Sequence, residues 1–244
     1  MEAADKPLDV PQEVAPNVWI VDGGPIGAMG VPLPIRMTVL RLDDGDLLLH
    51  SPIRHDDRLR RALERLGRIR HLVAPNSAHW MFLPDWQQHC PDALTWAAPG
   101  LRERRPVKKV GLRVDHDLGA APPAAWTEEI EQAIVPGGFG FAEVAFFHRA
   151  SRTLVLTDLV LNLEPAKLPP LARPLARLTG TTAPDGRAPV YLRWVIGRKR
   201  QQASRAAARL VAWNPERVIF AHGRWFERDA AGALRRSLAW LLPG

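Results

Sequence analysis

Residues 143–158 read EVAFFHRASRTLVLTD, and this stretch decides the fold. Two apolar runs, 143–147 and 153–161, flank the polar turn 148–152, which predicts a β-hairpin whose second run is interrupted by Asp158. A similar run at 218–221, VIFA, is followed directly by His222. Such runs are typical of buried strands that bring a polar residue to the edge of a sheet. Ligands of layered α/β proteins bind at that edge.

The same pattern extends outward along the chain. A third apolar run, 69–74, ends just before the polar segment PNSAH at 75–79. Residues 36–42 and 47–50 flank the turn 43–46 and predict another hairpin, preceded by a strand at 17–22 and a flexible glycine-rich loop at 23–30. Periodicity predicts helices at 56–66, 85–89, 191–213 and 231–242. The chain is therefore expected to be an α/β protein with its helices outside its sheets.

Length and composition favour one domain spanning residues 1–244, with a flexible arm at 1–14 and a proline-rich loop at 164–190 that contains one short helix. No apolar run approaches the roughly 20 residues of a membrane span, and the acidic start lacks the apolar core of a secretory signal. Cys90 is the only cysteine, which excludes an intramolecular disulfide and a cysteine-based zinc site. We expect a soluble, cytoplasmic protein without a membrane partner. Its oligomeric state is left open.

Charge is distributed unevenly along the sequence. Residues 1–162 contain 18 Lys and Arg against 21 Asp and Glu, whereas residues 163–244 contain 15 against 5. Arginines near Trp194 and Trp213 would suit single-stranded nucleic acid. Tryptophans at helix ends more often pack against the core, however, and arginines often form a solvated helix face. Nucleic acid is therefore the less favoured partner.

The order of these motifs resembles the metallo-β-lactamase superfamily, and in particular an uncharacterised branch described as a domain of unknown function. The residues that carry the resemblance are HSP at 50–52, VAPN at 73–76, the 143–158 segment with Leu159, and HG at 222–223, within a similarity that extends from about residue 15 to 240. The resemblance implies an αββα sandwich, in which two mixed β-sheets pack face to face with helices outside. It also implies one or two zinc or iron ions at the sheet edge, where hydrolysis of an ester, amide, thioester or phosphodiester takes place.

The metal motif of that superfamily is only partly present. Its pattern, His-x-His-x-Asp-His, falls on residues 74–79, where His79 alone keeps the parent residue type. The next parental histidine falls near Phe139, and the parental structural aspartate falls on His50. The bridging aspartate matches Asp158 and the last histidine matches His222.

One metal position should therefore be lost, while His79, Asp158 and His222 remain either as ligands for a single zinc or iron ion or, without any metal, as a hydrogen-bonded cluster that holds an anionic ligand or satisfies buried polar groups. The leading hypothesis is a protein with a degenerate metal site that is not a dinuclear hydrolase and that either binds a small ligand or acts as a scaffold. The first alternative is a mononuclear metal-dependent hydrolase that uses these three residues. The second is a nucleic-acid-binding protein that uses the basic C-terminal third.

Three further residues are candidates for the pocket. Asn76 is expected either to form a turn or to orient a substrate, and Glu143 either to replace a lost ligand or to pair with an arginine such as Arg36. His50 precedes Ser51, but neighbouring strand residues point to opposite faces, which argues against a Ser–His–Asp triad. Solvent exposure is expected for the five remaining histidines, which are His55, His71, His89, His116 and His148.

Overall fold

The computed structural model describes residues 7–28 and 31–242. Within these ranges a seven-stranded sheet contains its strands in chain order. They are β1 (Gln12–Ala15), β2 (Val18–Ala28), β3 (Val31–Arg41), β4 (Asp46–His50), β5 (Arg68–Ala74), β6 (Leu94–Ala97) and β7 (His116–Asp117). Strands β1 to β4 pair antiparallel, and β4 to β7 pair parallel. The sheet is therefore mixed.

The described residues form a second sheet with the strand order β12-β10-β9-β8. These strands are β8 (Ile130–Pro136), β9 (Ala142–His148), β10 (Thr153–Val155) and β12 (Arg217–Ile219). Strand β10 pairs antiparallel with β9 and parallel with β12. Two short strands, β11 (Leu161–Asn162) and β13 (His222–Gly223), pair parallel beyond the ends of β10 and β12.

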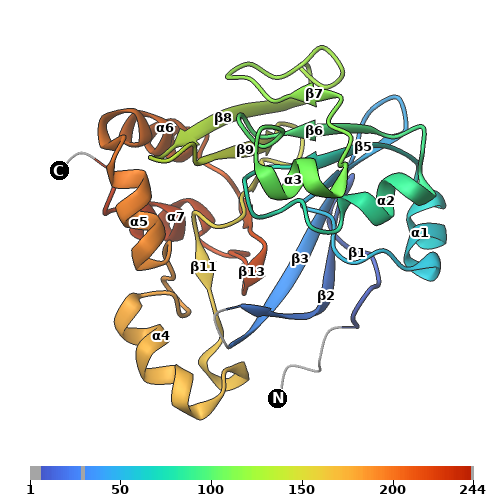
Figure 1. Cartoon of the computed structure of the whole chain (residues 1–244). Helices are drawn as coiled ribbons and strands as arrows, with labels where there is room; N and C mark the ends of the chain where they lie inside the picture. Colours follow the sequence, from blue (N-terminus) through green and yellow to red (C-terminus); the bar gives the residue numbers. More distant parts are fainter. Residues whose placement is uncertain (1–6, 29–30, 243–244) are drawn as a thin grey trace.

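Helices cover the outer faces of both sheets (Figure 1). On the first sheet lie α1 (Asp57–Glu64), α2 (Leu83–His89) and α3 (Arg105–Val110). On the second lie α5 (Val190–Gly197), α6 (Arg200–Ala212) and α7 (Ala230–Leu238), while α4 (Arg173–Thr179) projects below them. No helix in the described ranges is long and apolar enough to cross a membrane.

Strand β4 shows why the sequence gives a sandwich. All five of its residues are buried, but Leu48 packs in the core between the sheets, whereas Leu47 and Leu49 pack against the outer helices. Alternate side chains of a strand point to opposite faces, so a wholly apolar run requires cover on both. The expected αββα arrangement of two mixed sheets inside helices is confirmed.

Several local expectations were wrong. The glycine-rich segment 23–28 is not a flexible loop but continues β2, with irregular pairing between Gly23 and Ile26; residues 29–30 lie outside the described residues. A side chain at Gly23 would meet Ile35 and Ile53 at 3.1–3.2 Å, so close packing explains this glycine. The expected arm 1–14 is also corrected in part, because β1 begins at Gln12 and pairs with β2; residues 1–6 lie outside the description.

The helical segments in the second half of the chain are shorter and more numerous than expected. The helix expected over 191–213 is two helices, α5 and α6, separated at Arg198 and Lys199 directly after Gly197. The proline-rich segment contains its expected short helix, α4, and two short 3-10 turns, η1 (Pro165–Lys167) and η2 (Pro170–Ala172). Each of these begins with proline in its first turn, where the missing N–H is not needed.

Candidate metal centre

Three ends of apolar runs meet at one edge of the sandwich. His79 lies in the loop after β5, Asp158 follows Val155 of β10 by three positions, and His222 follows Ile219 of β12 by three. Val155 and Ile219 are direct partners in the parallel pair β10–β12, so both segments leave the sheet at the same edge; beyond it His222 pairs with Leu161, and Asp158 lies in the turn that precedes Leu161. His79 comes from the other sheet. This edge of the sandwich therefore brings together His79 and His222, which are more than a hundred positions apart in the sequence.

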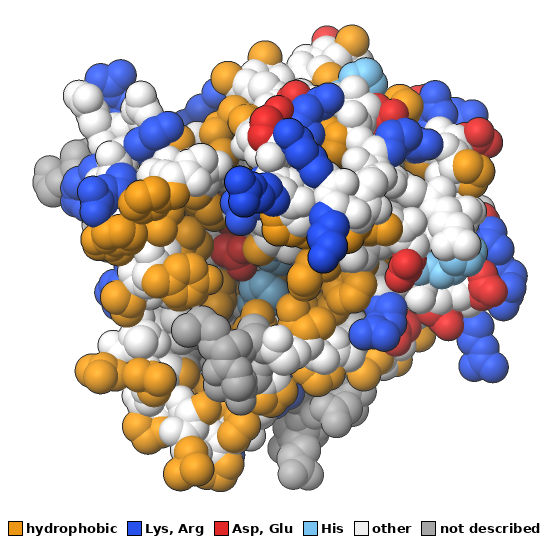
Figure 2. All heavy atoms as spheres, in the orientation of Figure 1, with side chains coloured by type: hydrophobic (Ala, Val, Ile, Leu, Met, Phe, Trp, Pro, Cys, Tyr) orange, Lys and Arg blue, Asp and Glu red, His pale blue; other side chains and the backbone are white. Residues whose placement is uncertain are grey.

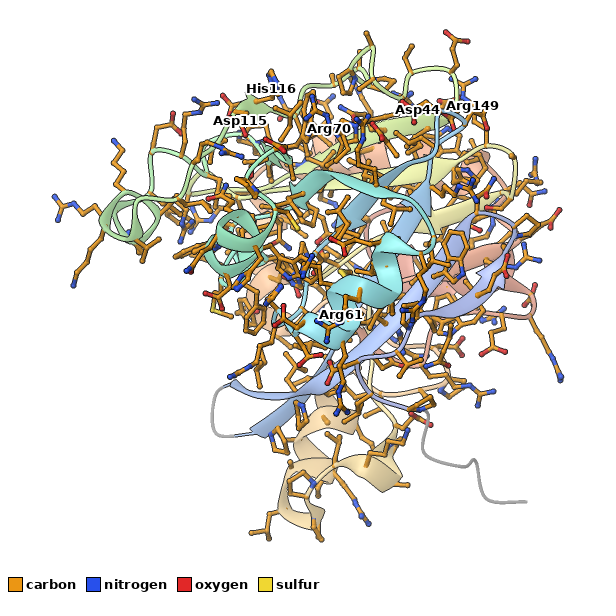
Figure 3. All side chains as sticks on the ribbon, turned by 90° about the vertical axis from the view of Figure 1, so that its right-hand side faces the viewer. Asp44, Arg61, Arg70, Asp115, His116 and Arg149 are labelled. Atoms are coloured by element: carbon orange, nitrogen blue, oxygen red, sulfur yellow. The ribbon has the colours of Figure 1, made fainter. Side chains whose placement is uncertain are left out.

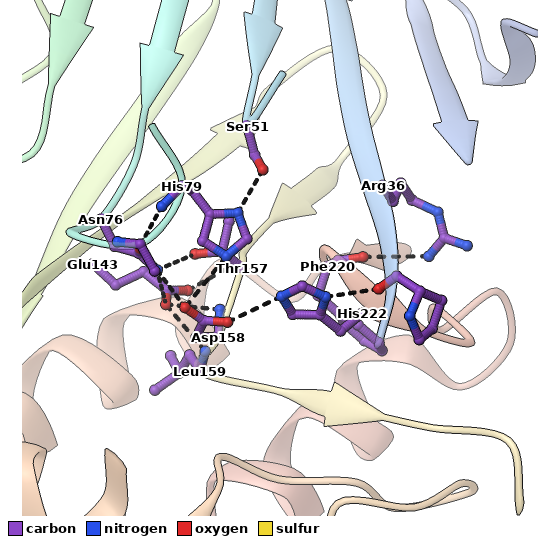
Figure 4. A network of polar contacts seen from close by, with 12 residues as sticks. Arg36, Ser51, Asn76, His79, Glu143, Thr157, Asp158, Leu159, Phe220 and His222 are labelled. Carbon is purple, nitrogen blue, oxygen red and sulfur yellow. Dashed lines mark hydrogen bonds and ion pairs between the residues drawn. The ribbon is translucent and has the colours of Figure 1, made fainter. Parts of the chain in front are cut away.

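The contacts among these three side chains are direct (Figure 4). Nε2 of His79 lies 3.3 Å from Oδ2 of Asp158, and Nε2 of His222 lies 3.2 Å from Oδ1 of the same carboxylate. One ligand atom from each residue lies within 4.8 Å of the other two. The side chains are 11%, 15% and 4% exposed for His79, Asp158 and His222, so solvent reaches the cluster from one side.

The tautomer of His222 follows from its second ring nitrogen. Nδ1 lies 2.8 Å from the carbonyl oxygen of Pro34, and because a carbonyl only accepts, Nδ1 carries the hydrogen. Neutral His222 then turns the lone pair of Nε2 toward a carboxylate oxygen. Two acceptors at 3.2 Å repel each other unless a proton or a metal ion lies between them. A ring nitrogen held by a backbone carbonyl is also the usual support of a metal-binding histidine.

Asn76 connects the His79 loop to Asp158. Its oxygen accepts from the backbone N–H groups of Ala78 and His79 at 2.8 and 3.1 Å, so it forms the expected turn. Its Nδ2 donates to Oδ2 of Asp158 at 2.8 Å and to the Thr157 hydroxyl at 2.9 Å. Asn76 is fully buried, and it holds the carboxylate as well as the loop.

Glu143 holds the loop that carries Asp158. Its Oε1 accepts from the N–H of Thr157 at 2.8 Å, and its Oε2 accepts from the N–H groups of Asp158 and Leu159 at 2.9 and 3.1 Å. The N–H of Leu156 still donates to the Ile219 carbonyl of β12 at 2.8 Å, and the next three amides bind Glu143 and not a neighbouring strand, which ends the pairing of this segment. The expected pairing with Arg36 is wrong: Arg36 pairs with Asp22 at 2.6 Å.

Burial and charge act against each other at this site. Burial alone would raise the pKa of Asp158, but His79 and His222 together hold the pKa of this carboxyl well below its usual range. Burial alone would lower the pKa of His79, yet the Asp158 carboxylate, with help from Glu143, raises it above the usual value. Burial and the neighbouring charge of Asp158 raise the pKa of Glu143. The cluster thus concentrates negative charge where a cation would be favoured.

His50 does not join the cluster. It is 1% exposed, and its ring packs edge-on against Phe146 with centroids 5.2 Å apart. Burial lowers the pKa of His50 to about 3, and Nε2 has no hydrogen-bond partner among the described residues. His50 is therefore a buried packing residue beside the site and does not offer a nitrogen ligand to the cluster.

Ser51 contacts the cluster, although its sequence position beside His50 argues against a triad. Its backbone turns into the left-handed region, with φ at 56°, and its Oγ lies 2.6 Å from Nδ1 of His79. The expectation against a Ser–His–Asp arrangement holds for His50 as the base, but Ser51, His79 and Asp158 do form a continuous line. No local sequence signal indicated it, because the turn after β4 re-aims the side chain.

Two of the remaining histidines correct the expectation of exposure. His71 is 4% exposed and accepts a hydrogen bond at 3.0 Å from Nε1 of Trp96, while His148 is 2% exposed and bonds Ser151 at 2.7 Å. His55 is half-buried. His89 and His116 are exposed as expected, with His116 at the edge strand β7 (Figure 3). None of the five approaches the cluster as a ligand.

The donor set fits one metal ion and not two. His79, Asp158 and His222 offer two imidazole nitrogens and one carboxylate, with His222 in the tautomer that binds metal. Ala74 and Ala78 have no donor atoms, and Asn76 turns an N–H donor toward Asp158. Phe139, where the parental histidine falls, is 74% exposed on the turn between β8 and β9.

The surroundings of the cluster are hollowed and partly apolar. Figure 2 shows a hollow in the face of the molecule, with acidic and histidine side chains at its floor and hydrophobic side chains along its border. Tyr191 of α5 lies close enough to Asp158 for the carboxylate, after burial, to raise the pKa of its hydroxyl. A separate cavity of about 490 Å³ opens beneath the β2–β3 hairpin. Pro34 and Gly223 line it, but none of the three cluster side chains does.

Fold and cluster together define a protein of the metallo-β-lactamase fold. Residues 16–182 match the family described as a domain of unknown function, DUF4336, and the chain belongs to this family. No curated protein matches the chain.

Solved structures show the same fold at low sequence identity. A metallo-β-lactamase from Hirschia baltica aligns with a TM-score of 0.63 at 13% identity, covering 98% of this chain and 100% of that one. A metallo-β-lactamase from Pontibacter korlensis gives 0.60 at 13%, covering 95% and 97%. The FIM-1 metallo-β-lactamase from Pseudomonas aeruginosa, in its mono-zinc form, gives 0.61 at 15%, covering 98% of each chain.

Proposed function

We propose that this chain binds one zinc or iron ion through His79, Asp158 and His222 and acts as a mononuclear metal-dependent hydrolase. The observation that carries the proposal is the approach of two imidazole Nε2 atoms to opposite oxygens of one carboxylate, at 3.3 and 3.2 Å. Because Pro34 fixes the proton of His222 on Nδ1, the lone pair of Nε2 faces into the cluster. A cation satisfies this arrangement.

The protein residues have separable tasks in this proposal. Glu143 and Asn76 fix Asp158 through its backbone and its carboxylate, and Ser51 and Pro34 fix the two imidazoles. A bound ion of this kind polarises a substrate carbonyl or phosphoryl group and lowers the pKa of a coordinated water. Three protein ligands leave room for water and substrate, as in catalytic sites generally.

Two observations favour one ion over the dinuclear alternative. The residues that would hold a second ion are replaced by Ala74, Ala78 and the exposed Phe139. A protein of the same fold, FIM-1 from Pseudomonas aeruginosa, has been solved in a mono-zinc form. The competing proposal is a metal-free scaffold in which a proton holds the His–Asp–His cluster together and a small anionic ligand binds beside it.

Elemental analysis of protein purified without chelators separates these proposals. We expect about one zinc or iron ion per chain, lost in His222→Ala and retained in the control His116→Ala, which changes an exposed histidine outside the cluster. Hydrolysis of simple aryl esters, thioesters and phosphodiesters should then disappear with chelator and return with metal. Metal-free wild-type protein, or equal metal content in both variants, would reject the proposal.

A further inference from the structure

An aromatic stack lies on the surface of the second sheet's helical layer, formed by Phe139, Trp194 and Arg198. The rings of Phe139 and Trp194 are nearly parallel, with centroids 5.5 Å apart and planes at 20°. The guanidinium carbon of Arg198 lies 4.4 Å from the Trp194 centroid and 5.7 Å from that of Phe139. Phe139 is 74% exposed and Trp194 is 56% exposed. Large aromatic side chains are seldom this accessible without a partner.

The chain contains a second trio of the same kind, which serves as a comparison. Phe147 and Trp213 stack with centroids 5.3 Å apart at 13°, and Arg209 lies 5.3 Å from the Trp213 ring. Phe147 is 6% exposed and belongs to the buried core, and Nε1 of Trp213 donates to Glu131 at 3.1 Å. That trio is explained by packing. Packing does not explain the stack of Phe139, Trp194 and Arg198, because its rings are exposed to solvent.

The backbone holds the exposed stack in place. Phe139 adopts a φ of 56°, a left-handed conformation that bulky residues seldom take, and such strain gathers at functional sites. Its turn is docked on α5, because the N–H of Gly138 donates to the carbonyl of Val195 at 2.8 Å. A Cβ at Gly138 would lie 2.9 Å from the side chain of Arg198. The rings are therefore presented by a fixed turn and not by a loose loop.

The same helix connects the stack to the metal centre. Val190 and Tyr191, one turn earlier on α5, are 52% and 57% exposed, and Tyr191 is near Asp158. In Figure 2 hydrophobic side chains border the hollow on the side where Figure 1 places α5. The exposed side chains of Val190, Tyr191 and Trp194 thus lead along one helix from the neighbourhood of Asp158 to the stack.

We propose that the substrate of the metal centre carries an aromatic ring system, which lies against Tyr191 and the aromatic stack. This proposal rests on the proposed hydrolase function. Parallel rings offer a flat ligand an offset-stacked contact, and the Arg198 guanidinium adds attraction for an electron-rich or anionic ring. The substrate class is an aromatic ester, thioester or amide.

Binding can be tested without turnover by titrating the protein calorimetrically with 2-naphthoate, and with octanoate as an apolar acid that cannot stack. We expect the Kd of 2-naphthoate to rise about tenfold in Trp194→Ala and in Phe139→Gly, while octanoate changes little. Glycine accepts a φ of 56° freely, so Phe139→Gly removes the ring without straining the turn. The matched control is Leu178→Ala, which removes an 85% exposed apolar side chain from α4, outside the stack.

The two proposals fail in different ways. Loss of 2-naphthoate binding in both stack variants, with Leu178→Ala unchanged, supports the recognition surface even if no ester is hydrolysed. Hydrolysis of ethyl 2-naphthoate with the same KM in wild type and Trp194→Ala would support the hydrolase and overturn the recognition surface. Absence of 2-naphthoate binding to wild type, or an equal Kd in Leu178→Ala and Trp194→Ala, would also overturn it.

Discussion

The hydroxyl oxygen of Ser51 lies 2.6 Å from Nδ1 of His79, although 28 positions separate them and each follows a different strand of the first sheet. Strands β4 and β5 are parallel neighbours, so their carboxyl ends emerge together, and the left-handed turn at Ser51 directs its side chain across the gap. Ser51 thereby supports the ring of His79 as Pro34 supports that of His222. Both imidazoles are oriented before any ion binds.

Removing this support should weaken metal binding. In Ser51→Ala the ring of His79 loses the partner of Nδ1, and loss of such a supporting hydrogen bond typically costs about 10- to 100-fold in metal affinity. Competitive zinc titration with a chromophoric chelator measures the change. Ser77→Ala is the control, because Ser77 lies in the same loop as His79 and its hydroxyl forms no hydrogen bond with the described residues. Equal zinc affinity in the two variants would contradict this role for Ser51.

Glu143 should be far more sensitive to substitution than its position in a strand indicates. Glu143→Gln replaces one of two accepting oxygens with an N–H2 group that faces backbone N–H donors. We expect the free energy of unfolding to fall by about 3 kcal/mol, since hydrogen bonds to a buried charge are lost and donors are left unpaired. Urea unfolding measures this loss.

The comparison for Glu143 is Glu128→Gln at an exposed position. That change should alter the free energy of unfolding by less than about 0.5 kcal/mol, as surface substitutions usually do. If Glu143→Gln were equally mild, Glu143 would not be what holds the Asp158 loop.

The sequence predicted the parts of the site that depend on strand ends. The apolar runs before Asp158 and His222 predicted where both residues lie, and the parallel pairing of β10 with β12 brings the segments that follow these strands to the same edge. The resemblance to a known superfamily added His79 and indicated which ligands were lost. These features follow from patterns along the chain, which a sequence displays directly.

The remaining parts depend on how the two sheets dock. The Ser51 contact requires a left-handed turn at a non-glycine residue, which no local rule indicates. The sequence favours a pair between Glu143 and Arg36, but backbone amides can satisfy a buried carboxylate equally well. The sequence does not show which loop lies beside Glu143. His71 was expected at the surface because charged residues flank it, yet it points toward Trp96.

Two buried histidines predict how stability depends on pH. Burial lowers the pKa of His50 to about 3 and that of His71 to about 4, against about 6.5 for an unfolded chain. Above pH 6.5 both histidines are neutral in the folded and in the unfolded chain, so neither makes the free energy of unfolding depend on pH. Below it the unfolded chain binds protons that the folded chain rejects, so the free energy of unfolding falls as pH decreases toward 4.

Replacing His71 tests this dependence. In His71→Gln the side-chain oxygen can still accept from Trp96, but one titrating group is gone. Between pH 6 and pH 4.5 the fall in the free energy of unfolding should become shallower by up to about 1.4 kcal/mol per pH unit, the limit for one proton. Urea unfolding at several pH values gives the slope. His116→Gln, at an exposed position, should leave it unchanged.

Gly223 should be required for the metal centre although it has no side chain that could bind an ion. Its φ of 90° is a conformation that side chains strain to adopt, and a Cβ there would collide with the backbone of Asn162 in the paired strand β11. Gly223→Ala should therefore separate β11 from β13, displace the adjacent His222 and lower the free energy of unfolding by more than about 2 kcal/mol. Elemental analysis and urea unfolding together measure both effects. In Gly24→Ala, where a Cβ meets nothing within 4 Å, metal content and stability should be retained, and equal behaviour of the two variants would show that β13 does not depend on Gly223.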